Sequence, residues 1–393
     1  MVLKILLIGV AVILGLLVVL PFVLSVAGFN YFNLPDFSSD GGGSSSSSSV
    51  GRGLLRSRDG GENWEDVSFL GDRRVSLPAQ ILDIAFHPQN PDLIFMGTRS
   101  SGIWKSIDTG QSWEKIYDKS RVLDPSADVY KIAVSRSNPQ ILYAALFQDR
   151  RGRVLRSSDG GNSFREIYFV TADNFGVFDL YINPVDEDWV MIVTGQGGVL
   201  ETKNGGRTWR VIKWFGNSLV KILVNPVFPM EMFVINDQGS IFKTFDRGEN
   251  WADLSEESGD LGGDNLSYRP QVGLDPFAGL FSRSNKVVAL VSDPRVFTTL
   301  YLGTKEGVLR SLDGGFVWKR LNLLIPPEAL PINAVAVHPR SSDIIFAGAS
   351  SQLHRSDDGG LNWRVAFLPV GGKVKNLFIH PLKPEIMFAV LER

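Results

Sequence analysis

The chain has 393 residues, of which 40 are Lys or Arg and 42 are Asp or Glu, and its formal net charge is −2. This balance gives no global attraction to nucleic acid, so we predict no nucleic-acid partner. Cysteine is absent, which excludes disulfides and a lipid-modified cysteine. Forty glycines, an aromatic content of 11% and the lack of a long helical period past residue 30 favour an all-β fold.

The N-terminal segment, residues 1–28, has the character of a membrane anchor. Residues 5–24 are almost wholly apolar and follow a single Lys4, and about 20 such residues span a bilayer as a helix. The sequence SVA at 25–27 also fits a signal-peptide cleavage site, so a cleaved signal segment remains the alternative. The apolar run exceeds the usual signal core, and Lys4 favours a cytoplasmic N-terminus. We therefore expect one transmembrane helix.

Residues 29–50 follow as a linker rich in Ser and Gly, with the run SSDGGGSSSSSS at 38–49. This composition is typical of a flexible chain, and the run spans about 20 Å on average. The sequence predicts a folded domain over residues 51–393 outside the cytoplasm. It is anchored in the cell envelope, or secreted if the first segment is cleaved.

An eight-residue pattern, Ser/Thr-x-Asp-x-Gly-x-x-Trp, recurs seven times from residue 57 at intervals of about 40–50 residues. Its hydroxyl and carboxylate can accept hydrogen bonds from loop N–H groups, and its Gly supplies a positive φ. We therefore predict hairpin turns with structural aspartates. The Asp slot holds Asp59, Asp108, Asp159, Asn204, Asp246, Asp313 and Asp358. The aromatic slot holds Trp64, Trp113, Phe164, Trp209, Trp251, Trp318 and Trp363.

A second repeat lies between the octets and consists of an apolar strand, an X-Pro turn and another apolar strand. Three of the four histidines, His87, His338 and His380, occupy its X slot. A metal cluster needs its ligands together, whereas the repeat distributes these histidines over separate units. We interpret them as turn residues and predict no metal and no cofactor.

Counting strands gives the architecture. Each unit has strand a before the Pro turn, b after it, c before the octet and d after it, which makes one blade of a β-propeller. The first strands after the linker are c and d, near residues 54–67, and the last are a and b, near 374–390. The two chain ends should complete one blade together. The sequence thus predicts seven four-stranded blades in a closed ring.

The two faces of this ring should differ. The a–b and c–d turns share one face and are regular, whereas the b–c and d–a loops vary and are the better place for a binding site. Eight basic residues are expected on that loop face as a partner-binding patch: Arg73, Arg74, Arg99, Lys119, Arg121, Arg150, Arg151 and Arg153. Arginine suits carboxylate recognition, although solvated loop charge, partly neutralised by Asp72, Asp124 and Asp149, is the alternative.

Two further features are candidate sites. The connection 254–286 is far longer than the others, and its Tyr268, Phe277 and Phe281 are candidate partner contacts if it is a binding loop rather than a disordered one. Strand a carries a repeated position that should line the central channel. Acid and base alternate there over four blades, at Asp83, Lys131, Asp179 and Lys221. We favour mutual neutralisation over ligand binding.

The octet resembles the Asp-box, or BNR-like repeat, in all seven copies, with Asn204 and Phe164 as departures. Among Asp-box propellers, sialidases carry an Arg-Ile-Pro signature that this chain lacks. Xyloglucan hydrolases place two carboxylates between two propellers, and this chain has one. Asp83 and Asp179 are the best carboxylate candidates, but Lys131 should keep both ionised, leaving no acid.

The single ring with D-G-G and H/N-P turns is also similar to the photosystem II stability/assembly factor family and to sortilin-type propellers. The resemblance covers about residues 51–393. It implies a non-enzymatic propeller that binds a protein or peptide, assisting assembly of a membrane or envelope complex. The alternative that it leaves open is a glycan-binding or glycoside-hydrolase-like propeller.

Overall fold

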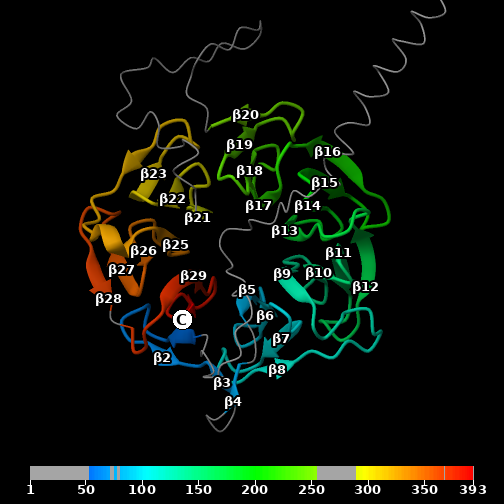
Figure 1. Cartoon of the computed structure of the whole chain (residues 1–393), viewed down its shortest axis with the longest axis horizontal. Coiled ribbons are helices and arrows are strands. Elements are labelled where there is room, and N and C mark those ends of the chain that lie inside the picture. The colour runs from blue at the N-terminus through cyan, green and yellow to red at the C-terminus, as the bar shows by residue number, and fades with distance from the viewer. Residues whose placement is uncertain (1–52, 71–74, 78–79, 255–288, 367, 393) are drawn as a thin grey trace, which may run out of the picture. The chain divides into compact units, whose positions relative to one another are not determined.

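The computed structural model describes residues 53–70, 75–77, 80–254, 289–366 and 368–392. Its strands form seven four-stranded antiparallel sheets arranged as the blades of a propeller, with β5, β9, β13, β17, β21, β25 and β29 innermost (Figure 1). A short hairpin, β3 (Phe69–Leu70) and β4 (Val75–Ser76), and one 3-10 turn, η1 (Pro327–Ala329), accompany them.

The blades are numbered from the one that contains both chain ends, and each is given from its inner to its outer strand. Blade 1 is β29 (Lys373–Ile379), β30 (Met387–Glu392), β1 (Gly53–Ser57) and β2 (Glu65–Asp66). Blade 2 is β5 (Ile81–Phe86), β6 (Ile94–Thr98), β7 (Ile103–Ser106) and β8 (Glu114–Lys115). Blade 3 is β9 (Asp128–Val134), β10 (Leu142–Gln148), β11 (Arg151–Ser157) and β12 (Arg165–Phe169).

The remaining four blades repeat the same order. Blade 4 is β13 (Val177–Ile182), β14 (Val190–Thr194), β15 (Gly198–Thr202) and β16 (Arg210–Trp214). Blade 5 is β17 (Leu219–Val224), β18 (Met232–Asn236), β19 (Ile241–Thr244) and β20 (Ala252–Asp253). Blade 6 is β21 (Ala289–Ser292), β22 (Leu300–Thr304), β23 (Gly307–Ser311) and β24 (Lys319–Arg320). Blade 7 is β25 (Ile332–Val337), β26 (Ile345–Ala349), β27 (Gln352–Ser356) and β28 (Arg364–Ala366).

The ring closes through blade 1. Strand β1 from the N-terminal side pairs antiparallel with β30 from the C-terminal end, with Leu55 opposite Ala389. The pair β29–β30 and the pair β1–β2 each form only half of this sheet. Their pairing through β1 and β30 therefore removes two open strand edges. The seven four-stranded blades and the shared closing blade confirm the architecture predicted from the repeats.

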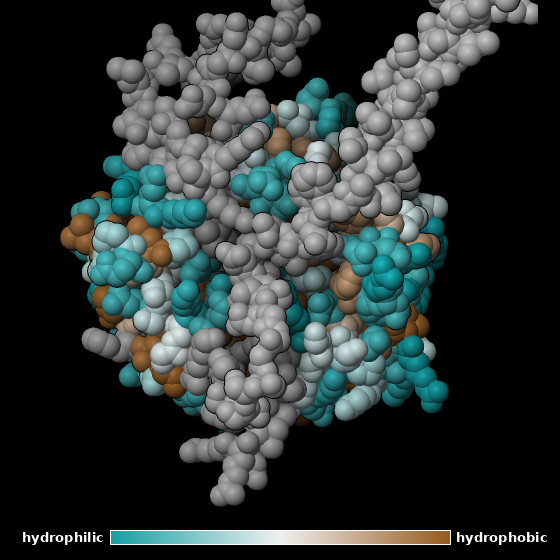
Figure 2. All heavy atoms as spheres, in the orientation of Figure 1, coloured by the Kyte–Doolittle hydropathy of each residue, from teal (hydrophilic) through white to brown (hydrophobic). Residues whose placement is uncertain are grey.

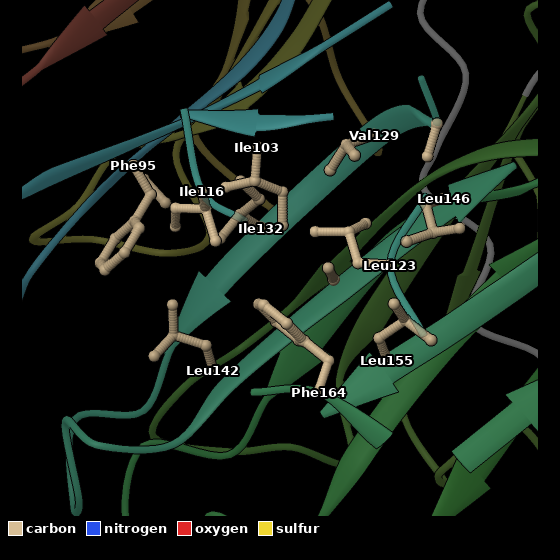
Figure 3. Close-up of a cluster of buried hydrophobic side chains, with 13 residues drawn as sticks. Phe95, Ile103, Ile116, Leu123, Val129, Ile132, Leu142, Leu146, Leu155 and Phe164 are labelled. Atoms are coloured by element: carbon tan, nitrogen blue, oxygen red, sulfur yellow. The ribbon is translucent and has the colours of Figure 1, made fainter. Parts of the chain in front are cut away.

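The hydrophobic core lies between neighbouring sheets rather than within one. The cluster between blades 2 and 3 joins Phe95 and Ile116 to Ile132, Leu142 and Leu155 (Figure 3). Strands of type b are buried along their whole length in most blades, because both faces of the sheet pack against neighbours. The continuous apolar runs at these strands, rather than a strict alternation, follow from this double burial.

The predicted N-terminal helix and linker lie outside the described residues. Within the part of the chain that is described, no helix combines the length and the apolar character needed to cross a bilayer. At the rim, hydrophobic (brown) side chains are exposed beside hydrophilic (teal) ones (Figure 2).

The two faces of the propeller follow from the strand order. The octets connect c to d and the X-Pro turns connect a to b, so both lie at the same ends of the strands, here called the octet face. The b–c turns lie at the opposite ends, here called the loop face. Strand β1 is a c strand, so the chain enters the propeller at Gly53 from the loop face.

Candidate functional site

The octets are turns whose polar side chains are occupied locally. In the first copy the Ser57 hydroxyl accepts a hydrogen bond from the N–H of Gly61 at 2.8 Å and donates to Asp59 at 2.9 Å. Asp59 Oδ1 also accepts the N–H of Asn63 at 2.9 Å. A hydroxyl-to-carboxylate or hydroxyl-to-amide pair recurs in all seven copies. These aspartates therefore hold backbone, which leaves them little capacity for chemistry.

The same hydrogen bonds explain the acidity of the octet carboxyls. The side-chain bond from Ser163, aided by backbone N–H groups, lowers the pKa of Asp159 to about 2. The backbone N–H of Asn362 and its side chain lower the pKa of Asp358 to about 2. Asn204 makes the equivalent contacts with its amide, donating to the Thr208 hydroxyl at 2.8 Å. An amide can therefore replace the octet carboxylate when the residue four positions later carries a hydroxyl group.

The X slots cap the Pro turns. Nδ1 of His87 accepts the N–H of Asn90 at 2.8 Å, and Nδ1 of His380 accepts the N–H of Leu382 at 3.0 Å. Asn183 and Asn225 do the same with their amide oxygens. Burial lowers the pKa of His87, His338 and His380, which suits a ring nitrogen that accepts. Among the described residues no group of three His, Cys, Asp or Glu side chains could hold a metal ion.

The alternating position of strand a follows a β-bulge. Six of the seven inner strands shift register immediately before it. In blades 2 to 5 the side chains at this position contact a neighbouring blade. Asp83 accepts hydrogen bonds from Lys131 Nζ at 3.0 Å and from the N–H of Ile132 at 2.9 Å, both in blade 3. Asp179 accepts the N–H of Ile222 at 3.1 Å and lies 3.9 Å from Lys221 Nζ.

These four residues therefore join blades in pairs, 2 to 3 and 4 to 5. Burial alone would lower the pKa of Lys131, but Asp83 and Asp179 outweigh it and raise that pKa. Both carboxylates are buried and fully engaged with lysines and backbone N–H groups. This arrangement neutralises charge across the inner ring and offers no unoccupied carboxylic acid for hydrolysis.

The basic patch is only partly assembled. Arg73 and Arg74, together with Tyr268, Phe277 and Phe281, lie outside the described residues. The structure places Lys119 elsewhere than predicted. Its N–H donates to the carbonyl of Asn162 at 3.0 Å, inside the third octet. The backbone of Lys119 therefore lies beside the octet of blade 3 and not at the loop face. The chain follows β7 as far as Ile103 and then folds back along blade 3.

The remaining arginines gather around the b–c turns of blades 2 and 3. Arg99 directly follows the b strand of blade 2, and Arg121 lies exposed in the connection between the blades. Arg151 pairs with Asp173 at 2.9 Å, and Arg153 pairs with Asp149 at 3.1 Å and with Glu166. Of these three acids, Asp149 alone was expected from the sequence to neutralise the patch. Arg150 is the most exposed of these three, 3.8 Å from Asp173.

Arg150 sits in an unusual turn. It forms with Asp149 the two-residue connection of β10 and β11, and both residues have positive φ, 48° for Asp149 and 62° for Arg150. Such primed turns normally use Asn, Asp or Gly followed by Gly, and an arginine at the second position costs on the order of 1 kcal/mol or more. The connection from blade 3 to blade 4 holds the turn, since the N–H of Asn174 donates to the Arg150 carbonyl at 2.7 Å.

Sequence reasoning missed a second set of ties between blades. The residue before the octet hydroxyl is basic in six of seven copies, which is a signal visible in the sequence. Four of these cations donate to a carbonyl in the next blade's octet: Arg56 to Thr109, Lys243 to Gly314, Arg310 to Gly359 and Arg355 to Gly60. These cations connect neighbouring blades at the octet face, and Asp83 and Asp179 connect neighbouring blades at the inner ring.

Two open cavities, ≈ 300 and ≈ 440 Å³, lie between blades 7 and 1. Glu62 lines both, and it forms ion pairs with Arg355 at 2.9 Å and with Arg364. The smaller cavity is lined mainly by polar and charged groups, whereas the larger one has Trp64, Val365, Ala366, Leu368 and Pro369 beside the ion pair of Glu62 and Arg364. The charged groups in both walls already pair with one another.

The chain resembles propellers of two functional kinds. No family model matches it. It is 26% identical over 134 residues to the xyloglucanase Xgh74A of Acetivibrio thermocellus, covering 29% of this chain and 16% of that protein. It is 27% identical over 112 residues to the VPS10 domain-containing receptor SorCS3 of Mus musculus, covering 28% of this chain and 9% of the receptor. The chain thus spans a small part of both curated relatives.

Solved structures extend the comparison over most of the chain. The GH74 xyloglucanase from Xanthomonas campestris superposes with a TM-score of 0.62 at 15% identity, covering 84% of this chain and 52% of the enzyme. YCF48 from Cyanidioschyzon merolae gives 0.58 at 14%, covering 80% of this chain and 96% of YCF48. YCF48 bound to D1 peptide gives 0.57 at 15%, covering 80% and 94%. At these identities the likeness shows the propeller fold alone.

Proposed function

We propose that this propeller binds a protein or peptide partner through the loop face of blades 3 and 4, and that it assists assembly of a membrane or envelope complex. The observation that carries the proposal is the Asp149–Arg150 turn. Both of its residues hold a left-handed conformation, and the Arg150 side chain stays 71% exposed. A strained turn that presents an arginine to solvent has no folding role that a glycine could not fill.

Aromatic side chains accompany these arginines. Phe169 and Trp214 end the outer strands β12 and β16 at the loop face, and both are exposed. Phe175 accepts the N–H of Gly152 at its carbonyl and is also partly exposed. Arginines and large aromatics dominate the binding energy of protein interfaces, because both combine apolar area with directional contacts. The mixture fits a peptide that carries carboxylates and apolar residues.

The similarity to YCF48 supports this reading. One of the YCF48 structures is bound to a peptide of D1. The propeller of this chain superposes on 94% of that YCF48 chain. The similarity to xyloglucanases covers only about half of that enzyme. A propeller that matches most of a peptide-bound protein and only half of an enzyme supports binding as the proposed role.

The proposal is tested by affinity capture from detergent-solubilised membranes of the native host. Arg150→Glu with Arg151→Glu should abolish capture of the partner. Lys319→Glu with Arg320→Glu, an exposed pair on β24 in blade 6, changes the net charge equally and serves as the control. Capture that survives the first double change, or that is lost equally with both, contradicts the assignment of the loop face.

The proposal includes an extracytoplasmic position, with residues 5–24 as a transmembrane anchor and residues 29–50 as the linker. The supporting observation is the apolar run in the sequence. Recovery of the protein in carbonate-washed membranes with residue 1 intact is the expected result. A soluble protein that begins near residue 28 would instead establish a cleaved signal segment.

A glycan-binding or glycan-cleaving propeller is the second candidate, favoured by the similarity to two xyloglucanases. It predicts release of reducing sugar from xyloglucan, lost in Asp83→Asn or Asp179→Asn. Both carboxylates are already engaged with lysine and backbone N–H groups, so we expect no turnover. Turnover that depends on either carboxylate would replace the binding proposal.

A further inference from the structure

Six hydrophobic side chains are exposed together on the octet face of blades 5 and 6: Val227, Phe228, Met230, Phe245, Phe316 and Val317. Val227 is 89% exposed and Phe228 is 57% exposed. The rings of Phe245 and Phe316 stack with centroids 6.1 Å apart, and the N–H of Arg247 donates to the Met230 carbonyl at 3.1 Å. The six residues therefore form one surface across the joint of the two blades, here called the apolar tips.

The octet of blade 6 does not require Val317. The position of Val317 is Asn, Ser or Thr in the other six octets, where in most copies it donates to the octet aspartate. Val317 cannot make that bond, yet its turn forms with Asp313 accepting the two backbone N–H groups. Hydrophobicity that gives up a local hydrogen bond and remains exposed indicates an external contact.

The shape of this surface favours a soft partner. The tips come from three separate turns, the X-Pro turn of blade 5 and the octets of blades 5 and 6, and each turn projects from the ends of its strands. A second copy of the chain or another rigid surface would meet such separate projections at few points. A lipid bilayer flows around them, so each side chain can bury its exposed area.

The charges beside the tips fit the same partner. Arg247 and Arg295 are exposed in the octet of blade 5 and in the X-Pro turn of blade 6. The carboxylates of Asp246 and Asp313 accept turn hydrogen bonds. Apolar and aromatic side chains flanked by arginines are typical of segments that lie at the membrane interface, where the guanidinium groups meet lipid phosphates.

The length of the chain before Gly53 permits this orientation. Residues 25–52 could extend to about 90 Å, whereas the longest strands, with seven residues, span about 23 Å. The chain can therefore start in a membrane, enter the propeller at the loop face and still leave the octet face against the bilayer.

We propose that the apolar tips insert into the interface of an anionic lipid bilayer, with Arg247 and Arg295 at the level of the headgroups. This goes beyond the proposed function, because it assigns the octet face to the membrane and leaves the loop face of blades 3 and 4 pointing away from it. The partner site and the lipid site are then on opposite faces of the same ring.

The absence of cysteine makes a direct test possible. Phe228→Cys and, as a loop-face control, Asn217→Cys are each labelled with an environment-sensitive fluorophore in the full-length chain. The protein is reconstituted in vesicles of phosphatidylcholine and phosphatidylglycerol that contain nitroxide-labelled acyl chains. Quenching at position 228 and none at 217 is expected. Quenching at 217 without quenching at 228, or at neither position, overturns the inference.

A second variant separates lipid insertion from damage to the fold. Val227→Ser with Val317→Ser, measured through a label at Phe228→Cys, should weaken the membrane contact about tenfold. Val185→Ser with Leu361→Ser, two exposed octet-face residues of blades 4 and 7, is the matched control and should leave it unchanged. An equal loss in both pairs contradicts the assignment of the tips.

The membrane anchor is tested separately from the apolar tips. Release of the protein from the vesicles by carbonate shows that residues 5–24 do not anchor it, whatever the quenching pattern. Vesicles of phosphatidylcholine alone test the arginines, since removal of the anionic lipid should weaken quenching at position 228. Undiminished quenching there would remove Arg247 and Arg295 from the inference and overturn the choice of an anionic surface.

Discussion

The ammonium nitrogen of Lys243 in blade 5 lies 2.7 Å from the carbonyl oxygen of Gly314 in blade 6. The lysine is almost wholly buried, pairs with Glu231 at 3.1 Å and is covered by the rings of Phe245 and Phe316. Burial lowers its pKa. A buried cation therefore connects two blades whose sequence connection is the long segment after Leu254.

We predict that Lys243→Met destabilises the protein by about 3 kcal/mol, because it leaves the buried Glu231 carboxylate without its cation. Adding Glu231→Met should recover a large part of that loss, since it removes the stranded charge. Urea unfolding of the single and double variants measures both effects. A double variant as unstable as the sum of the two single variants would show that the pair is not coupled.

Lys131→Met should destabilise the protein by about 1–2 kcal/mol, and Lys221→Met by less. Lys131 contacts Asp83 at 3.0 Å, whereas Lys221 is more exposed and 3.9 Å from Asp179. The channel is partly open to solvent, which reduces both values relative to a fully buried pair. Chemical denaturation at neutral pH tests the order of the two variants, and the reverse order would contradict the role assigned to Asp83.

The histidine turns predict a loss of stability as pH falls from about 6.5. Burial lowers the pKa of His380 in the folded state, so the unfolded chain takes up a proton first. The free energy of unfolding therefore declines as the pH falls below the pKa of the histidine in the unfolded chain. His380→Asn, which copies the residue found at Asn183 and Asn225, should reduce this dependence. Melting temperatures between pH 7.5 and 5 measure it. An unchanged slope in the variant would show that His380 does not contribute.

The octets predict a second acid transition at lower pH. Hydrogen bonding lowers the pKa of Asp159 to about 2. The contribution of this residue to the free energy of unfolding is therefore full above about pH 4 and is lost as the pH falls toward 2. Asp159→Asn should fold normally, because Ser163 offers the hydroxyl that Thr208 offers to Asn204. Its melting temperature should fall less between pH 4 and 2 than that of the parent chain, as measured by circular dichroism.

The fold was predictable because its information is local and repeated. Each octet contains the hydroxyl, the carboxylate and the glycine that its turn needs, so seven copies specify seven blades, and the missing half-blade at each end predicts closure. The contacts of the proposed binding face were harder to predict. Asp173 and Glu166 neutralise arginines from segments that fold back onto β11, and no local pattern announces such contacts.

Two other features could not be predicted from the local sequence. Lys119 was expected on the loop face because it follows blade 2, but its N–H pairs with the carbonyl of Asn162 in the octet of blade 3. In the turn at Asp149–Arg150, Asp is a usual first residue but Arg stands where Gly is normal, so the local sequence did not indicate the positive φ values. The basic residue that precedes six of the seven octets was visible, but the contact that four of these residues make with the next blade required the structure.

The proposed partner site depends on Arg150 and Arg151. It is tested by the dissociation constant of the isolated partner for the full-length protein in detergent, measured for Arg150→Glu with Arg151→Glu and for Lys319→Glu with Arg320→Glu. We predict about 30-fold weaker binding for the first pair and near-parent binding for the second. Equal affinity of the two variants would contradict it.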